Sequence, residues 1–192
     1  MTRYVLRALG VLLCLGMLAM AGDAFAQKVP AGVSAELPVA ITCPGQAPEG
    51  QIVKLIFTRL KTTVNYDPFL EARDLGKHKT LIIILGGSGK GLGTAGVDLK
   101  DEMKRAEQLV AEAVKKKIAL VGIHAGGADR RGDVSTRLID LVAPKMQYLV
   151  VREDGNADGL FTKLAGERKI PLTVIKTTPE LSDVFKELFK IK

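Results

Sequence analysis

The stretch Thr80-Leu81-Ile82-Ile83-Ile84-Leu85, followed at once by Gly86-Gly87-Ser88, decides the fold class. An almost wholly apolar run rich in β-branched residues is typical of a strand that helices cover on both faces. A strand with one solvent-exposed face would instead alternate apolar and polar residues. The glycines that follow end the strand and mark a turn. This stretch therefore predicts a parallel sheet of the α/β class.

The chain on either side of this strand alternates strands with helices. We expect further strands at Leu37–Thr42, Thr62–Asn65, Ile118–Ile123, Gln147–Val151 and Leu172–Lys176. We expect helices at Gly50–Leu60, Leu99–Lys117, Val134–Ala143, Gly159–Glu167 and Glu180–Lys190, and a loop or short helix at Asp67–Leu75. The alternation predicts a single-domain, three-layer α/β sandwich, Rossmann-like or flavodoxin-like, with a mainly parallel sheet of five or six strands.

The helix expected at Leu99–Lys117 has the clearest amphipathic pattern. Asp98 is a good N-cap for it, because its carboxylate can accept a hydrogen bond from a free backbone N–H. Its buried face is expected to consist of Met103, Ala106, Leu109, Val110 and Ala113.

The first 26 residues have the pattern of a secretory signal peptide. Arg3 and Arg7 precede the short apolar run 11–21, and Ala24-Phe25-Ala26 offers a cleavage site. The run is too short to span a bilayer stably. We expect cleavage after Ala26, a flexible leader at 27–36 and a domain at 37–192. The mature protein is then periplasmic or secreted, without stable membrane insertion.

The composition narrows the classes of partner. Of 28 basic and 21 acidic residues, two arginines and one aspartate lie in the signal segment, so the mature chain carries a net charge of +6. We interpret most of this excess, such as the run 115–117, as solvated helix faces. Few aromatic residues and the exported setting make nucleic acid an unexpected partner. Cys43 is the one cysteine after the signal segment, and no thiol-enzyme pattern surrounds it, so we interpret it as a packing residue.

In parallel sheets, ligands bind outside the carboxyl ends of the strands, where this chain gathers glycines and charges. The residues 91–96 match G-x-G-x-x-G, but no acidic residue ends a strand about twenty positions later, as a dinucleotide site requires. Lys90 is followed by Gly91 rather than Ser or Thr, so the loop is not a Walker A motif. Two interpretations stay open: an anion cradle with Lys90 as counter-charge, or a loop that needs glycines for its backbone shape.

His124 ends a strand, and Arg130 and Arg131 follow it closely. Guanidinium groups bind carboxylate and phosphate in a two-pronged way, so the two arginines could hold a small anion together with the glycine loop. The alternative is that one arginine pairs with Asp129 or Asp133 and shapes the loop.

The residues 154–159 match the first half of a calcium loop, with oxygen ligands at Asp154, Asn156 and Asp158. The twelfth position is Ala165, so the bidentate glutamate is missing. The alternative is an Asx-rich turn in which Asn156 or Asp158 caps the next helix.

Together these segments resemble an uncharacterised family of exported bacterial proteins, a domain of unknown function. The resemblance covers about Val39 to Leu188. It rests on Thr42, Gly45-Gln46, Lys90-Gly91-Leu92-Gly93, Ala95-Gly96, His124, Gly126-Gly127, Arg130-Arg131-Gly132, Asp158-Gly159 and Phe161. It implies one composite site and an extracytoplasmic location, and it implies no activity.

We therefore expect an exported protein that binds a small anionic ligand at the carboxyl edge of its sheet, as an accessory to transport or sensing. The expected ligand-binding residues are Thr42, Gln46, Lys90, Gly91, Gly93, His124, Arg130 and Arg131. No cofactor is expected apart from the calcium alternative. One alternative is a small periplasmic hydrolase with His124 as base and Arg130 and Arg131 stabilising an oxyanion. A further alternative is a protein-interaction module.

Overall fold

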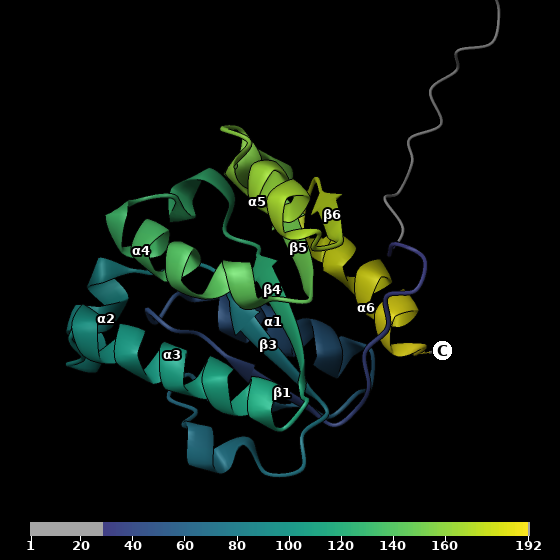
Figure 1. Cartoon of the computed structure of the whole chain (residues 1–192), viewed down its shortest axis with the longest axis horizontal. Coiled ribbons are helices and arrows are strands. Elements are labelled where there is room, and N and C mark those ends of the chain that lie inside the picture. Colours follow the sequence, from purple (N-terminus) through teal and green to yellow (C-terminus); the bar gives the residue numbers. More distant parts are fainter. Residues whose placement is uncertain (1–28, 192) are drawn as a thin grey trace, which may run out of the picture.

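The computed structural model describes residues 29–191, so the predicted signal peptide lies outside the described residues. Six parallel strands form one sheet in the order β2-β1-β3-β4-β5-β6 (Figure 1). They are β1 (Val39–Thr42), β2 (Asn65–Tyr66), β3 (Thr80–Ile84), β4 (Ala119–His124), β5 (Tyr148–Arg152) and β6 (Leu172–Ile175). The predicted single-domain α/β sandwich is confirmed, and the strand order is of the flavodoxin type.

Helices cover both faces of the sheet. They are α1 (Glu49–Arg59), α2 (Gly89–Ala95), α3 (Leu99–Lys115), α4 (Asp133–Val142), α5 (Leu160–Arg168) and α6 (Leu181–Phe189). Short 3-10 turns lie at η1 (Ala72–Leu75), η2 (Gly127–Arg130), η3 (Ala143–Lys145), η4 (Glu153–Asn156) and η5 (Thr178–Glu180). None of the helices within residues 29–191 is long and apolar enough to cross a bilayer.

The strand β3 shows why the apolar run at 80–85 needed cover on both sides. Ile82 and Ile84 pack into the core under α1 and α6, where Phe57 and Phe185 stack with ring centroids 4.3 Å apart. Leu81 and Ile83 point the other way, into the core under α3, α4 and α5. Successive side chains of a strand face opposite sides, so each half of this run fills a different core.

The glycine-rich segment expected to be a loop forms the short helix α2. Ser88 caps it, with its Oγ accepting a hydrogen bond from the N–H of Gly91 at 3.0 Å. Leu92 is buried and anchors the helix. Gly96 ends it at φ +66°, a left-handed conformation that glycine adopts without strain. A good cap and one buried leucine thus outweigh the low helix propensity of the glycines.

The long helix α3 confirms one expectation and corrects another. Asp98 caps it, because its Oδ1 accepts from the N–H of Lys100 at 2.7 Å. The buried face carries Glu102 in place of Met103, which is partly exposed. Residue 102 lies on the same helical face as Ala106 and Leu109, so geometry buries it although it is charged.

Residues 29–36, expected to form a flexible leader, are held against the amino edge of the sheet and α6. Val29 is buried, and its N–H donates to Glu187 Oε2 at 3.1 Å. The N–H of Ala35 donates to the carbonyl of Leu188 at 3.1 Å. Glu36 exchanges two hydrogen bonds with the Thr80 hydroxyl at the start of β3. The segment is therefore part of the folded domain.

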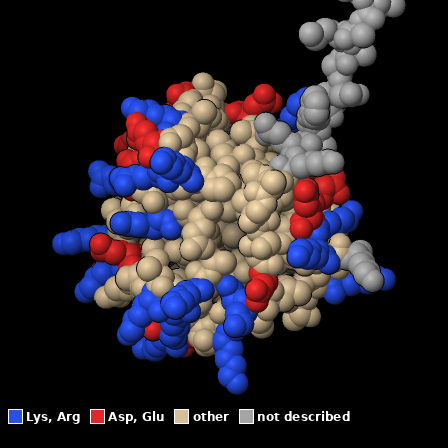
Figure 2. All heavy atoms as spheres, turned by 45° about the vertical axis from the view of Figure 1, so that its right-hand side comes forward, with Lys and Arg blue, Asp and Glu red and all other residues tan. Residues whose placement is uncertain are grey.

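The basic residues do not gather into one patch on the face that Figure 2 shows. Lys and Arg lie mostly around its margin with acids among them, and its centre is largely uncharged. Within α3, Lys115 and Lys116 both pair with Glu112, at 3.7 and 3.5 Å. This distribution fits solvated helix faces.

Candidate functional site

The parallel sheet brings the predicted site residues to its carboxyl edge, but into two separate groups. Thr42 ends β1 and Gln46 follows it, and Lys90, Gly91 and Gly93 lie in α2 after β3. His124 ends β4, Arg130 and Arg131 follow it, and Asp154, Asn156 and Asp158 follow β5. The first group surrounds the switch point between β1 and β3, where the chain changes direction across the sheet. The second group lies over β4 and its two neighbours, β3 and β5.

The switch point, where flavodoxin-like proteins bind ligands, is packed shut. The N–H of Ser88 donates to the carbonyl of Gly45 at 2.8 Å. A Cβ on Gly45 would lie 2.8 Å from the Cα of Gly87, and one on Gly91 would collide with the carbonyl of Gln46. The glycines here allow backbone segments to touch each other. This close approach favours the interpretation in which the glycines serve backbone shape at these positions.

A buried ion pair beneath the switch point uses the polar groups of Thr42 and Gln46. The carboxylate of Glu102 receives two hydrogen bonds from Arg105, at 2.9 and 2.8 Å, one from the N–H of Gly45 at 3.1 Å and one from the Gln46 amide at 3.4 Å. Burial alone would raise the pKa of Glu102, but the hydrogen bonds and charge of Arg105 lower it below its usual value.

Arg105 also ties the loop after β2 to this ion pair. It donates to the carbonyls of Pro68 and Leu70 at 2.9 and 2.7 Å, and Thr42 lies 3.4 Å from its Nη1. Sequence reasoning missed both members of the pair. The available signal was a glutamate on the apolar stripe of α3, at the spacing of Ala106 and Leu109. Thr42 and Gln46 thus help to hold the loops together.

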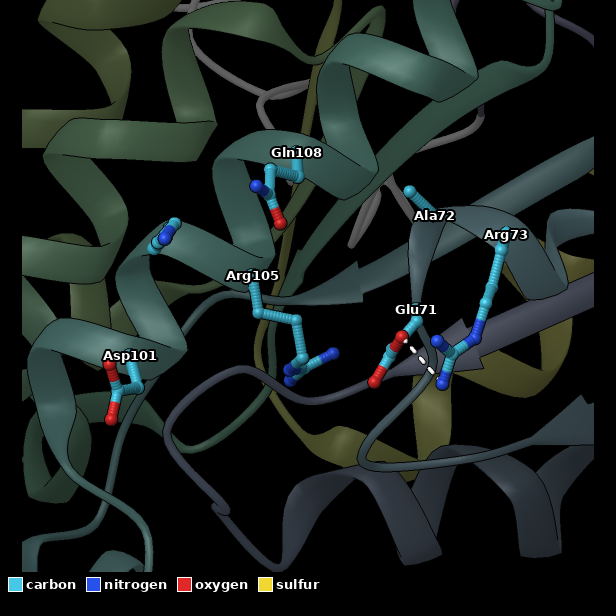
Figure 3. Close-up of a pocket in the computed structure, with 7 residues that line it drawn as sticks. Glu71, Ala72, Arg73, Asp101, Arg105 and Gln108 are labelled. Carbon is cyan, nitrogen blue, oxygen red and sulfur yellow. Dashed lines mark ion pairs between the residues drawn. The ribbon is translucent and has the colours of Figure 1, made fainter.

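Arg105 also lines a surface pocket of about 470 Å³ between α3 and η1 (Figure 3). The other lining residues are Glu71, Ala72, Arg73, Asp101, Lys104 and Gln108. Arg73 pairs with Glu71 at 2.9 Å, on the side of the pocket opposite α3 (Figure 3). The lining carries three basic and two acidic side chains, and two of the basic ones, Arg73 and Arg105, are already paired with Glu71 and Glu102.

His124 is buried between two carbonyl groups. Its Nδ1 lies 2.5 Å from the carbonyl of Leu85 and its Nε2 lies 3.2 Å from that of Gly127. Phe161 packs on the ring with centroids 5.0 Å apart, and Gly155 leaves the room that the ring fills. Burial lowers the pKa of His124 below its usual value, although both carbonyls favour the charged form. The imidazole is fully buried, so it does not face solvent.

Arg131 and Arg152 are both held in two-pronged pairs with acids. Arg131 donates to both carboxylate oxygens of Asp158, at 3.0 and 2.7 Å, and to the carbonyl of Gly155. Its Nε is buried and has no partner among residues 29–191. Arg152 donates to both oxygens of Asp154, at 2.6 and 2.5 Å. The hydrogen bonds from these arginines lower the pKa of Asp158 and lower that of Asp154 to about 2.

The side-chain oxygens predicted as calcium ligands accept hydrogen bonds from other groups of the protein. Asp154 and Asp158 hold the arginines described above. Asn156 Oδ1 accepts from the N–H groups of Phe161 and Thr162, and Asp158 Oδ1 accepts from that of Leu160 at 3.2 Å. Within the described range, no cluster of three or more His, Cys, Asp or Glu is placed to hold a metal. The contacts are those of the alternative interpretation, an Asx-rich turn that caps α5.

Arg130 differs from the other two arginines because it is held at one nitrogen. Its Nε lies 3.0 Å from Glu49 Oε1 and 3.2 Å from Oε2. Its Nη1 has a long contact of 3.5 Å to the carbonyl of Asp129, and its Nη2 has no partner among residues 29–191. Neither Asp129 nor Asp133, the acids expected from the sequence, pairs with Arg130 or Arg131. The partners Glu49 and Asp158 come from distant parts of the chain, which the local sequence does not reveal.

Glycines at the ends of β3 and β4 make room for Arg130. A Cβ on Gly86 would lie 3.5 Å from the Arg130 Cβ, and one on Gly126 would collide with its Cγ. The backbone N–H groups of Gly86, Ala125 and Gly126 donate no hydrogen bond to an acceptor within residues 29–191. The stem of Arg130 therefore lies over two strand ends that still carry backbone donors.

Two more residues of the carboxyl edge, Lys90 and Cys43, differ in their exposure. Lys90 is exposed on α2 and makes no ion pair with any residue that the structure describes. Cys43 is fully buried, and its Sγ donates to the carbonyl of Ala47 at 3.1 Å. Burial raises the pKa of this thiol to about 12, so the helix start that follows does not activate it.

The comparisons with known proteins give a family and one distant structure. The family described as "Domain of unknown function (DUF6305)" matches residues 36–189. No curated protein sequence matches the chain. The psychrotrophic esterase EstA from Pseudoalteromonas sp., inhibited by monoethylphosphonate, is 10% identical with a TM-score of 0.28, over 71% of this chain and 76% of that chain. A TM-score this low does not bear on activity.

Proposed function

We propose that this chain, which belongs to the DUF6305 family of unknown function, binds a small anionic ligand over the carboxyl ends of β3 and β4. Arg130 is the main contact in this proposal. The proposal also includes export: the signal pattern is removed after Ala26, and the protein acts outside the cytoplasmic membrane as an accessory to transport or sensing. The exported protein then begins at Gln27, which an intact-mass measurement checks.

The observation that carries the proposal is that the terminal nitrogens of Arg130 contact no carboxylate among residues 29–191, and that the one contact they make there is the 3.5 Å contact of Nη1 with the Asp129 carbonyl. Arg131 and Arg152 each place two guanidinium nitrogens on a carboxylate, whereas Arg130 contacts Glu49 through Nε alone. The terminal nitrogens of Arg130 can therefore form two parallel hydrogen bonds with an incoming carboxylate or phosphate. Its side chain is 25% exposed, so a ligand can reach it from solvent.

The surroundings of Arg130 add donors suited to an anion. The N–H groups of Gly86 and Gly126, which have no acceptor among residues 29–191, lie at the strand ends beside its stem, and the N–H of Ala125, which has none there either, directly precedes Gly126 in the chain. Such amides stabilise an anion without carrying a full charge. Lys90 is a further exposed cation at the same edge of the sheet. Arg131 has a different role in this proposal, because its pair with Asp158 holds the loop that carries Arg130.

The hydrolase alternative has less support. It needs His124 as a base within reach of substrate, and the imidazole is instead buried between the carbonyls of Leu85 and Gly127. Cys43 cannot replace it, because its thiol is buried and its pKa is raised. No contact among residues 29–191 favours the interaction-module alternative.

Isothermal titration calorimetry with acetate, succinate, inorganic phosphate and sulfate tests the proposal, with glycerol and glucose as neutral comparisons. We expect at least one anion to bind and the neutral compounds not to bind. Arg130→Ala should weaken that binding by about ten- to a hundredfold, since a charge-assisted hydrogen bond contributes roughly 1.5–3 kcal/mol. Arg168→Ala is the matched control, because Arg168 is exposed at the far end of α5. Binding of the neutral compounds alone, or equal affinity in Arg130→Ala and the parent, would overturn the proposal.

A further inference from the structure

We infer that Glu49 is an internal competitor for the anion site, a carboxylate of the protein itself that a ligand must displace or tolerate. This inference rests on the proposed function, because it concerns the same guanidinium. Glu49 begins α1, and its side chain is only 10% exposed. Its carboxylate is the one ionic partner of Arg130 within the described part of the chain.

The position of the carboxylate matches what an anionic ligand would need. A Cβ on Gly126 would lie 2.9 Å from Glu49 Oε1, so the carboxylate sits directly over the strand end that carries a free N–H. Among residues 29–191 the carboxylate makes no hydrogen bond with that N–H, and it accepts one hydrogen bond, from Arg130 Nε. Glu49 therefore resembles a ligand carboxylate that is already seated beside the arginine.

The strength of the contact makes exchange feasible. Two-pronged pairs such as Arg131 with Asp158 fix both groups, and breaking one leaves two charges without partners. Arg130 uses Nε for Glu49, holds Nη1 only by the 3.5 Å contact with the Asp129 carbonyl, and has no partner for Nη2 among residues 29–191. The guanidinium can therefore bind a ligand before the Glu49 contact is lost. The negative charge of Glu49 nevertheless acts against any incoming anion throughout this step.

The electrostatic repulsion between Glu49 and a bound anion follows from Coulomb's law. Two unit charges about 5 Å apart at an effective dielectric constant near 20 repel each other enough to reduce affinity by roughly two orders of magnitude. Salt and the partial exposure of the site screen part of this effect. Removing the charge of Glu49 should therefore tighten anion binding by roughly tenfold or more.

Glu49→Gln tests the inference, because glutamine keeps the shape and an oxygen acceptor for Arg130 Nε while it loses the charge. Calorimetric titrations with inorganic phosphate and with acetate should show a gain of roughly tenfold over the parent. Glu107→Gln is the matched control, since Glu107 is exposed on α3 and pairs with no described residue. The double variant Glu49→Gln/Arg130→Ala should lose the gain, because the anion then lacks its guanidinium.

The outcomes separate this inference from the proposed function. If the parent binds an anion and Glu49→Gln binds it equally or more weakly, Glu49 is a positioning residue and the competitor role is refuted, while the anion site stands. If neither protein binds any of the anions tested, both ideas fail. A second measurement does not depend on the variant: saturating phosphate should move the Nε–H resonance of Arg130 in the NMR spectrum of the parent. An unmoved resonance on a bound protein would overturn the inference.

Discussion

Replacement of Arg105 by methionine should destabilise the protein strongly and in a pH-dependent way. The change removes both guanidinium bonds to Glu102, whose side chain is 2% exposed, and leaves the carboxylate with only Gly45 and Gln46. It also leaves the carbonyls of Pro68 and Leu70 without their donor. Loss of one partner of a buried ion pair typically costs about 3–5 kcal/mol. At about 2–4 °C per kcal/mol for a domain of this size, the melting temperature should fall by roughly 6–20 °C.

The stability lost in Arg105→Met should also depend on pH. In the parent, the pKa of Glu102 lies below the usual value of 4.5, so its pairing stabilises the fold above that pH, and the contribution is lost as the pH falls through the folded-state pKa. In Arg105→Met, burial without the guanidinium raises this pKa instead. The folded variant then takes up a proton at a higher pH than the unfolded chain, so its deficit shrinks as the pH falls toward 4.5.

Urea unfolding followed by circular dichroism, at neutral pH and near pH 4.5, measures both parts of the prediction. Arg73→Met is the matched control, because Arg73 is 77% exposed and pairs with Glu71 at the surface. That pair should contribute no more than about 1 kcal/mol. The reasoning about Glu102 is refuted if the two variants lose similar stability at neutral pH, or if the deficit of Arg105→Met is the same at both pH values.

Two further predictions concern the carboxyl edge. Gly126→Ala should weaken anion binding about as much as Arg130→Ala does, because the new methyl group collides with the Arg130 stem. Calorimetry with phosphate measures this, and unchanged affinity would show that the arginine can move aside. Cys43→Ser should keep any anion binding within a few-fold. The native thiol should resist iodoacetamide at neutral pH until the protein unfolds, because burial raises its pKa to about 12. Fast alkylation of the native protein would contradict this account.

The fold could be predicted from the sequence because its signals are local. The apolar run at 80–85 needs two covered faces, and the period of α3 is readable from its leucines and alanines. The helix α2 was missed because the glycines suggest a loop, whereas the cap by Ser88 and the burial of Leu92 depend on tertiary packing. Met103 was misplaced for a related reason: hydropathy alone does not reveal that Glu102 has a buried partner.

The site was predictable in its location and less so in its details. Parallel strands place their carboxyl ends together, so the loops after β1, β3, β4 and β5 had to meet at one edge. Which acid pairs with which arginine depends on contacts between distant segments, as with Glu49 and Arg130, which lie 81 positions apart. The local sequence offered Asp129 and Asp133 as partners, and it contains no information that would select Glu49.

The packing of residues 29–36 along the amino edge fixes the point at which anything joined before Val29 meets the folded domain. The contacts of Val29 with Glu187 and of Ala35 with Leu188 hold this segment beside the last helix, at the end of the sheet opposite Arg130. A tag, carrier protein or surface linked at that end would therefore leave the carboxyl edge pointing outward and open to solutes. An immobilised form of the protein could be used directly as a capture reagent for its ligand.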